Sequence, residues 1–320
     1  MNKQNAISDG TAAMDLSIVI PVLNEQDNVR PLFRQLRTVL RQMHLRYELI
    51  FVDDGSTDGT WDVLTRLYED QSHVTAIRFA RNFGQTAAMR AGIELARGER
   101  IVTIDGDLQN DPRDIPRLLR KMDEGFDLVI GWRKDRKDSL WLRTLPSRVA
   151  NWLIGRVTGV HLHDNGCSLK AYRGDMIKQV PLYSEMHRFI PILSQLAGAR
   201  MTEIVVRHHP RRHGLSKYGL SRVGGVLLDV FAIKMLVTCA KRPLHWFGAL
   251  SLPFFIAATA TAIGYVLVSG LHQGQPPLVV TSIAFFLFLY LGLHLLFIGL
   301  LAELIVKANY NSAENTARSR

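Results

Sequence analysis

The sequence predicts an α/β protein with a mostly parallel sheet, followed by an amphipathic helix at a membrane surface and two transmembrane helices. Short apolar runs alternate with helical patterns up to residue 130. Two long segments without a charged residue lie near the C-terminus, behind a strongly basic stretch. These observations divide the 320 residues into a polar tail at 1–15, an α/β domain at 16–210, a basic loop with an interface helix at 211–245, two membrane helices at 246–306 and a polar tail at 307–320.

Five short apolar runs predict the strands of the sheet, and four amphipathic patterns predict the helices between them. The strands are expected at Leu16–Val22, Glu48–Val52, Val74–Phe79, Ile101–Ile104 and Asp127–Ile130, with a later strand at Arg200–His208. The helices are expected at Val29–Met43, Gly59–Tyr68, Thr86–Ala96 and Pro112–Met122. Because strands and helices alternate, the helices should cover both faces of the sheet.

The two C-terminal segments are long enough to cross a lipid bilayer. Trp246–Val268 has 23 residues and Leu278–Leu301 has 24, and neither contains Lys, Arg, Asp or Glu. A helix that rises about 1.5 Å per residue needs about 20 residues to span the hydrocarbon core. Lys241 precedes the pair and Lys307 follows it, whereas the connector between the two segments has no Lys or Arg. The positive-inside rule then predicts a multi-pass protein of the inner membrane with both termini and the α/β domain in the cytoplasm.

The stretch before the first span is strongly basic. From Arg207 to Arg242 there are eight Lys or Arg residues against one acid, Asp229. Apolar residues at near-helical spacing within Tyr218–Ala240 predict an amphipathic helix on an anionic leaflet, although a helix packed on the α/β domain would show the same pattern. Nucleic acid is the usual alternative partner for a net charge of +10. We expect none, because the charge clusters beside the membrane spans and no nucleic-acid-binding motif occurs.

Composition and motifs exclude several other classes of protein. Two cysteines, Cys167 and Cys239, cannot build a disulfide-rich scaffold or a four-cysteine zinc site. Residues Met1–Asp15 are polar and the next apolar run is too short for a signal peptide, so we expect no export by an N-terminal leader. The motifs GxGxxG, GxxxxGK[ST], HExxH, CxxC and GxSxG are all absent.

Polar residues follow four of the predicted strands, at Asn24-Glu25, Asp53-Asp54, Arg81-Asn82 and Asp105–Gln109. Ligands of parallel sheets bind at the carboxyl ends of the strands, so these residues should meet at one rim. In the last group, two carboxylates and an amide suit Mg²⁺ or Mn²⁺, which prefers oxygen ligands and keeps coordination positions for phosphate. Asp105, Asp107 and Gln109 are therefore the candidate metal ligands.

Six segments together resemble one enzyme family. Three of them resemble successive motifs of the inverting family 2 glycosyltransferases with the GT-A fold: Ser17–Glu25, Val52–Thr60 and Ile104–Gln109. The other three resemble the polyisoprenyl-phosphate glycosyltransferases, such as dolichol-phosphate mannose synthase, the bactoprenol glucosyltransferases and the undecaprenyl-phosphate aminoarabinose-type transferases: Arg81–Gln85, Asp164–Lys170 and Arg211–Tyr218.

The resemblance covers about residues 16–242 and extends to the paired spans. It implies a Rossmann-like GT-A catalytic domain and a metal-dependent, inverting reaction. A sugar from a UDP- or GDP-linked donor would pass to undecaprenyl or dolichyl phosphate. The lipid-linked sugar would then serve the modification of a cell-envelope glycan or lipid.

The resemblance also assigns expected roles to residues on the donor side. The nucleotide should be bound by Pro21, Leu23, Glu25 and Asp53, of which Asp53 would accept a hydrogen bond from the base. The diphosphate and its metal should be held by Asp105, the backbone of Gly106, Asp107, Gln109, Arg211 and Lys217. Asp107 and Lys217 are expected to be catalytic, because they would stabilise the departing diphosphate.

On the acceptor side, the resemblance implies that Arg133, Arg143 and Ser147 bind the lipid phosphate. Arginine suits this role because its planar fork binds phosphate oxygens in pairs. Asp164 is a third expected catalytic residue that would orient the sugar hydroxyls or act as a base, and a loop cap is its alternative role. His187–Pro191 is expected to line the sugar pocket. A strong general base is not required, since a phosphate monoester with a second pKa of about 6 is largely dianionic at pH 7.

Two alternative functions remain at this point. A processive polysaccharide synthase would share the fold, but it needs a general base and a QxxRW motif, and that motif is absent. A nonenzymatic nucleotide- or lipid-binding membrane adaptor would have no need to keep Asp105, Asp107 and Gln109. Glycines within the spans, at Gly248, Gly264, Gly292 and Gly299, would permit homo-oligomers to form through the transmembrane helices.

Overall fold

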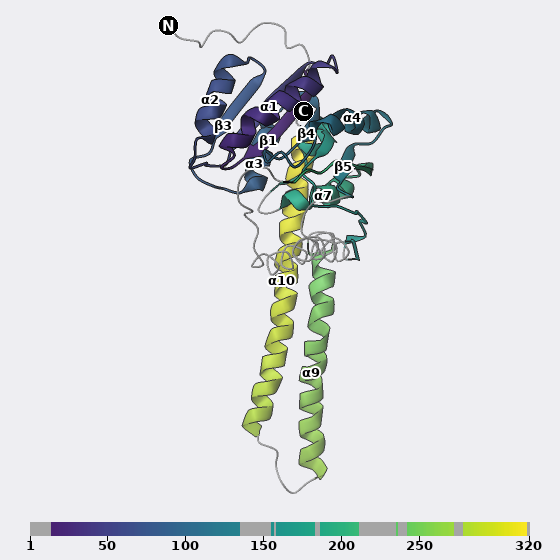
Figure 1. The fold of residues 1–320 in the computed structure, drawn as a ribbon. Coiled ribbons are helices and arrows are strands. Elements are labelled where there is room, and N and C mark those ends of the chain that lie inside the picture. Colours follow the sequence, from purple (N-terminus) through teal and green to yellow (C-terminus); the bar gives the residue numbers. More distant parts are fainter. Residues whose placement is uncertain are drawn as a thin grey trace. The chain divides into compact units, whose positions relative to one another are not determined.

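The computed structural model describes residues 14–134, 155–156, 158–182, 186–210, 235, 242–271 and 278–318. The chain divides into two compact units between Val230 and Phe231. The first unit contains the sheet and the second contains the two C-terminal helices (Figure 1). Most of the predicted interface helix lies outside the described residues, as do Arg143, Ser147, Arg211 and Lys217.

The predicted strands and helices of the first unit are present. The strands are β1 (Met14–Val22), β2 (Tyr47–Asp53), β3 (Val74–Arg78), β4 (Gly98–Thr103) and β5 (Leu128–Trp132). The helices are α1 (Gln26–Arg41), α2 (Thr60–Asp70), α3 (Gln85–Leu95) and α4 (Ile115–Asp123), the last preceded by a 3-10 turn, η1 (Pro112–Asp114). Pro116 lies in the first turn of α4, where its missing N–H leaves no hydrogen bond unmade.

The described strands form one sheet in the order β3-β2-β1-β4-β6-β5-β7. Strand β7 (Met201–Val205) lies within the last predicted strand and runs parallel to β5. Strand β6 (Lys170–Arg173) was not predicted, and it pairs antiparallel with both β4 and β5. It has four residues and carries a charge at each end, so it lacks the apolar run by which the other strands were recognised. The prediction of a mostly parallel sheet is confirmed, with one antiparallel strand inserted.

Apolar side chains from the two faces of the sheet enter separate cores, because successive residues of a strand point in opposite directions. In β1, Leu16, Ile18 and Ile20 pack on the face covered by α1, α2 and α4, whereas Val19 packs on the other face. That second face is covered by α3 and by the short helices α6 (Gly174–Ile177) and α7 (Ile190–Leu196). The sheet is therefore a central layer between helices, and its strand ends are left free to carry a site.

In the described part of the second unit, two helices pack side by side, α9 (Pro243–Leu271) and α10 (Leu278–Arg318) (Figure 1). Both are long and apolar enough to cross a membrane, over Pro243–Ser269 and Leu278–Ala308. Two of the predicted contact glycines lie where the helices meet: a Cβ at Gly292 would lie 3.0 Å from the Phe255 ring, and one at Gly299 would lie 2.8 Å from Phe247 Cβ. Helix α10 continues to residue 318, through most of the segment expected as a polar tail.

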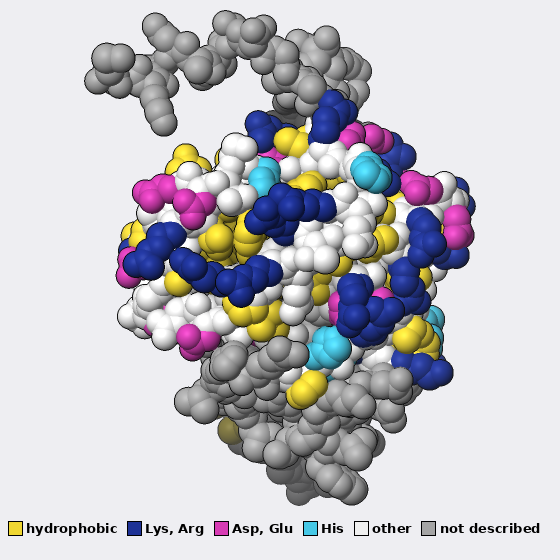
Figure 2. Space-filling view, turned by 45° about the horizontal axis from the view of Figure 1, so that its top comes forward, with side chains coloured by type: hydrophobic (Ala, Val, Ile, Leu, Met, Phe, Trp, Pro, Cys, Tyr) yellow, Lys and Arg dark blue, Asp and Glu magenta, His cyan; other side chains and the backbone are white. Residues whose placement is uncertain are grey.

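The surface of the first unit carries many basic side chains. On the face drawn in Figure 2, Lys and Arg side chains are spread widely and acidic side chains form smaller groups. This distribution agrees with the ten excess positive charges of the sequence.

Candidate active site at the strand ends

The loops that follow β1 and β2 are joined by hydrogen bonds between their residues. The backbone N–H of Asn24 donates to Ser56 Oγ at 2.9 Å, and Asn24 Oδ1 accepts from the N–H of Thr57 at 2.9 Å. The N–H of Glu25 donates to Thr60 Oγ1 at 2.8 Å. Asn24 has a φ of 53°, a conformation that asparagine tolerates better than most residues. These hydrogen bonds hold the two loops together beside the predicted nucleotide site.

Asp53 ends β2 with a fully buried carboxylate whose direction is fixed. Its Oδ1 accepts from the N–H of Ser56 at 2.9 Å, and its Oδ2 lies 3.5 Å from Arg78 Nε. The Arg78 guanidinium also lies over the Trp61 ring, 5.5 Å from its centre. The arrangement keeps an oriented hydrogen-bond acceptor at this rim, and the base-binding role of Asp53 stays a prediction.

Asp54, the next residue, stabilises a loop. Its carboxylate accepts from the N–H of Phe83 at 2.7 Å and from the N–H of Gly84 at 3.0 Å. Gly84 has a φ of 95°, which favours glycine, and α3 begins immediately after it. The first residue of α3, Gln85, then donates from Nε2 to Asp105 Oδ1 at 2.7 Å. Gln85 thus contacts a candidate metal ligand, and no role was predicted for it although it ends the Arg81–Gln85 motif.

The loop from Asp105 to Gln109 passes close to the end of β1. A Cβ at Gly106 would lie 2.7 Å from Val22 Cγ1 and 3.5 Å from the carbonyl oxygen of Pro21, so only glycine fits there without a shift. Asp107 is buried, and its Oδ1 accepts from the N–H of Gln109 at 3.1 Å. The structure thereby places the end of β1, where residues are predicted to bind the nucleotide, against the loop after β4 that is predicted to bind the metal.

The electrostatics of this loop favour a cation. Burial and the neighbouring carboxylate of Asp107 raise the pKa of Asp105 to about 6. Within the described residues, no three His, Cys, Asp or Glu side chains converge on a point that could hold a metal ion. Two carboxylates beside an amide fit a hard divalent cation that takes its remaining ligands from a diphosphate. The donor set of Asp105, Asp107 and Gln109 suits Mg²⁺ or Mn²⁺ by its chemistry, and their role as metal ligands stays a prediction.

Arg133 and Asp164, for which separate roles were predicted, are paired with one another. Arg133 Nε donates to Asp164 Oδ2 at 2.7 Å and Arg133 Nη2 donates to Asp164 Oδ1 at 2.9 Å. Their side chains are only 11% and 4% exposed, so water screens the pair little. Burial opposes the charge of Arg133, but the hydrogen bonds to Asp164 outweigh it and raise its pKa. The predicted lipid-phosphate role of Arg133 and catalytic role of Asp164 stay untested.

Strand β6 and the residues just before it add buried polar groups for which no role was predicted. Lys170 is buried and donates from Nζ to the carbonyl oxygens of Asn165, at 3.3 Å, and Cys167. Burial lowers the pKa of Lys170 and raises that of the Cys167 thiol to about 11, so the thiol stays protonated. Ser168 Oγ accepts from Asn110 Nδ2 at 2.8 Å.

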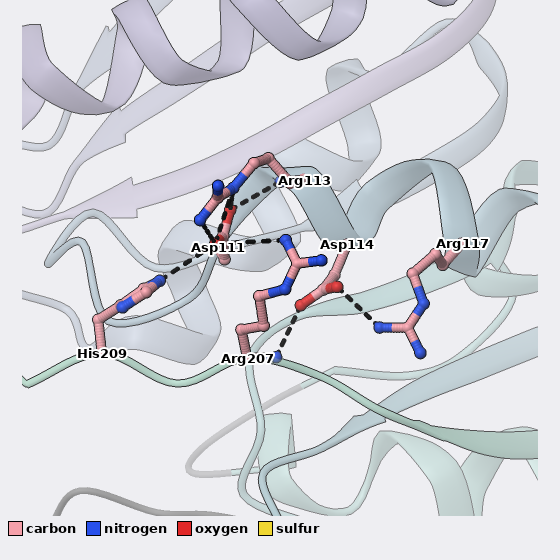
Figure 3. Close-up of polar contacts among 6 residues, drawn as sticks. All are labelled: Asp111, Arg113, Asp114, Arg117, Arg207 and His209. Atoms are coloured by element: carbon pink, nitrogen blue, oxygen red, sulfur yellow. Dashed lines mark hydrogen bonds and ion pairs between the residues drawn. The ribbon is translucent and has the colours of Figure 1, made fainter.

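A cluster of charged residues joins the end of the metal loop to the segment after β7 (Figure 3). Asp111 Oδ2 lies 3.1 Å from His209 Nε2 and 3.8 Å from Arg207 Nη1, and its carboxylate also accepts from Arg113. Asp114 Oδ2 accepts from the N–H of Arg207 at 2.7 Å. We call Asp111, Asp114, Arg207 and His209 the latch. Although burial opposes ionisation, the hydrogen bonds from Arg113 and His209 hold the pKa of Asp111 well below its ordinary value.

The predicted sugar-pocket segment is tied to α3. His187 lies in the 3-10 turn η3 (Met186–Arg188), and its Nδ1 is 2.8 Å from Thr86 Oγ1. Thr86 follows Gln85, whose amide reaches Asp105, so η3 is joined to the metal loop through two consecutive residues. The role of this segment in sugar binding stays a prediction.

Comparison with known proteins identifies the family. Glycosyl transferase family 2 matches residues 17–180. The chain is 44% identical over 313 residues to a dodecaprenyl-phosphate galacturonate synthase of Rhizobium johnstonii, covering 95% of this chain and 91% of the relative. It is 38% identical over 300 residues to an undecaprenyl-phosphate 4-deoxy-4-formamido-L-arabinose transferase of Edwardsiella ictaluri, covering 93% and 91%.

Solved structures agree on the fold. Glucosyl-3-phosphoglycerate synthase from Mycobacterium tuberculosis, in complex with Mn²⁺, UDP-glucose and phosphoglyceric acid, superposes with a TM-score of 0.54 at 20% identity. The match covers 71% of this chain and 80% of that one, and it supports the predicted GT-A fold of the first unit. By its family match and its close relatives, the chain belongs to glycosyl transferase family 2 and is a glycosyltransferase.

Proposed function

We propose that this glycosyltransferase moves a sugar from a UDP- or GDP-linked donor to a polyprenyl phosphate. The observation that carries the proposal is the extent of the similarity to relatives named for polyprenyl-phosphate products. It covers 95% and 93% of the chain, so it includes the C-terminal helices as well as the α/β unit. A polyprenyl tail stays in the bilayer, and a catalytic unit with two apolar helices can work at the headgroup level.

The donor would bind along the rim formed by β1, β2 and β4. Asp53 would accept a hydrogen bond from the base, beside Pro21, Leu23 and Glu25. Asp105, Asp107 and Gln109 would hold Mg²⁺ or Mn²⁺ against the diphosphate, and the cation would neutralise the charge of this leaving group. Arg211 and Lys217 would supply further positive charge to the same group.

The acceptor phosphate would be the nucleophile. A phosphate oxygen forms a bond to the anomeric carbon of the sugar while the bond from that carbon to the diphosphate breaks. Direct displacement inverts the anomeric configuration, so an α-linked donor gives a β-linked product. Because the phosphate is already largely ionised at pH 7, the side chains need to orient it and need not remove a proton. Arg133, Arg143 and Ser147 are the residues proposed to orient it, and Asp164 would orient the sugar hydroxyls.

The membrane location is part of the proposal. The two apolar helices would cross the inner membrane, with the catalytic unit on the cytoplasmic side, where nucleotide sugars are made. The basic segment before α9 would lie against anionic headgroups.

A transfer assay in detergent tests the function. Purified full-length protein is mixed with undecaprenyl phosphate, Mn²⁺ or Mg²⁺, and each of a panel of radiolabelled UDP- and GDP-sugars. We expect label to enter the lipid phase with one donor and to stop when EDTA is added, and NMR of the product should show an inverted anomeric centre. Label in a polymer would instead indicate a processive synthase. No transfer together with no binding of UDP or GDP would overturn the proposal.

A further inference from the structure

The loop that carries the candidate metal ligands contains an unfavourable backbone conformation. Leu108, between Asp107 and Gln109, has a φ of 61°, and its side chain is buried. Leucine rarely adopts this left-handed region, and such residues persist only where the surroundings impose the conformation. The loop therefore depends on contacts that hold it from outside.

Among the contacts of this loop are hydrogen bonds at its start, within it and at its end. At the start, Gln85 donates to Asp105, and in the middle the N–H of Gln109 donates to Asp107 Oδ1. At the end, the carbonyl oxygen of Gln109 accepts from the N–H of His209 at 2.8 Å, next to an antiparallel bridge between Asn110 and His208. The end contact reaches the segment after β7, about a hundred residues along the chain.

Side-chain contacts within the latch support the hydrogen bond between His209 and Gln109. Asp111 is 4% exposed and Asp114 is fully buried, whereas the side chains of Arg207 and His209 that reach Asp111 are 50% and 43% exposed. Figure 3 shows His209, Arg207 and Arg113 reaching Asp111 from three different directions. Arg113 lies two residues from Asp111 and holds it within its own turn, whereas His209 and Arg207 hold it to the distant segment. Only the second kind of contact can fix the metal loop against the rest of the fold.

We infer that Asp111 is a positioning residue for the nucleotide-sugar site. Through its contact with His209, Asp111 holds the Asp105–Gln109 loop in the conformation that presents Asp107 and Gln109 to a metal ion and the donor diphosphate. Asp114 supports it by fixing the backbone of Arg207. The inference rests on the proposed function for the identity of the ligand. It adds two residues that do not touch the donor, Asp111 and His209, to the determinants of donor affinity.

Nucleotide binding tests this role without turnover. Isothermal titration of the full-length protein in detergent measures the affinity for UDP and for GDP, each with Mn²⁺. We expect His209→Ala to lower the affinity for the nucleotide that the wild type binds by about tenfold, and Asp111→Asn to lower it by a similar factor. His209→Gln should recover most of the affinity, because its amide can still donate to Asp111. Arg113→Ala is the matched control, which removes a cation from the same carboxylate and should change affinity less than about threefold.

A double-mutant cycle separates positioning from a general structural effect. The losses from His209→Ala and Gln109→Ala should be less than additive, because both act on the same loop, whereas those from His209→Ala and Asp53→Asn should add. In transfer assays, His209→Ala should raise KM for the nucleotide sugar and leave KM for undecaprenyl phosphate unchanged.

Three results would overturn the inference. They are wild-type affinity in both His209→Ala and Asp111→Asn, an equal loss in Arg113→Ala, and full additivity with Gln109→Ala. In each of them the wild type still binds nucleotide and transfers sugar, so the proposed function stands. A wild-type protein that neither binds UDP or GDP nor transfers sugar would overturn the proposed function itself.

Discussion

The two halves of the sheet hold their strand-end loops by different interactions. Around β1, β2 and β3, side-chain oxygens bind backbone N–H groups of the neighbouring loop, as Asn24 and Asp54 do. Around β5 and β6, buried opposite charges from distant segments pair, as Arg133 does with Asp164, and the side chains of Asp111 and His209 lie 3.1 Å apart beyond β4 and β7. A backbone N–H is present whatever the residue, but an ion pair needs both side chains. The second half should therefore be more sensitive to single substitutions.

The largest effect is expected at β4, between the two halves, where function and not stability depends on charge. Asp107→Ala removes a carboxylate whose hydrogen bond from the N–H of Gln109 lies within the loop, and we expect the protein to stay folded. Transfer should fall at least about a thousandfold, equivalent to about 4 kcal/mol of activation free energy, because the diphosphate loses a metal ligand. The transfer assay measures this, with Asp123→Ala on α4 as the control for an exposed aspartate. Retained turnover would refute the metal assignment.

The next effect tests the charged half of the sheet directly. Arg133→Ala leaves the buried carboxylate of Asp164 without its cation, and we expect a loss of about 3–5 kcal/mol of unfolding free energy. Arg133→Lys keeps the charge but not the two parallel hydrogen bonds, so it should lose less. Denaturant unfolding of the first unit, followed in the detergent-solubilised protein, measures both.

An exposed ion pair supplies the control for that experiment. Arg46 and Asp15 have side chains 54% and 29% exposed, so Arg46→Ala should lose less than about 1 kcal/mol. Similar losses of unfolding free energy for Arg133→Ala and Arg46→Ala would show that burial does not make the Arg133–Asp164 pair more important for stability.

A smaller effect is expected in the hydrogen-bonded half. Asp54→Ala leaves the N–H groups of Phe83 and Gly84 without their acceptor, which should lose about 1–3 kcal/mol of unfolding free energy. Asp54→Asn keeps one carbonyl oxygen and should lose less. The same unfolding experiment measures the loss. If Asp54→Ala were more destabilising than Arg133→Ala, the contrast between the two halves would be wrong.

The smallest effect is a dependence of stability on pH in the hydrogen-bonded half. His73 is half-buried against Phe33 and Tyr47, and burial together with Arg37 and Arg41 lowers its pKa. Below pH about 6.5 the unfolded chain binds a proton on this residue that the folded chain binds less readily, so its contribution to stability falls as the pH falls. Unfolding at about pH 5.5 and about pH 7.5 measures the difference.

His73→Gln provides the matched comparison, because it keeps a polar side chain without a titrating group. The difference in stability between the two pH values should be smaller in this variant than in the wild type. An unchanged difference would assign the pH dependence to other residues.

Some residues around the candidate site could be predicted from the sequence, and others could not. The position of Asp105, Asp107 and Gln109 beside the end of β1 could be predicted from sequence, because they follow an apolar strand and the order of strands and helices places such loops at one rim. Gln85 and Asp111 could not, since their importance lies in contacts with Asp105 and His209. A motif shows that a polar residue is present, but a partner can be identified only when the register of the strands is known.

The sequence by itself determined the alternating strands and helices of the first unit, the two long apolar helices and the position of the metal loop. These follow from the local periodicity of apolar residues and from the length of uncharged segments. Only the tertiary structure decided that β6 enters the sheet antiparallel between β4 and β5, and that Arg133 pairs with Asp164. Both depend on pairing between segments far apart in the chain, where the geometry of the whole sheet selects one partner among many of similar chemistry.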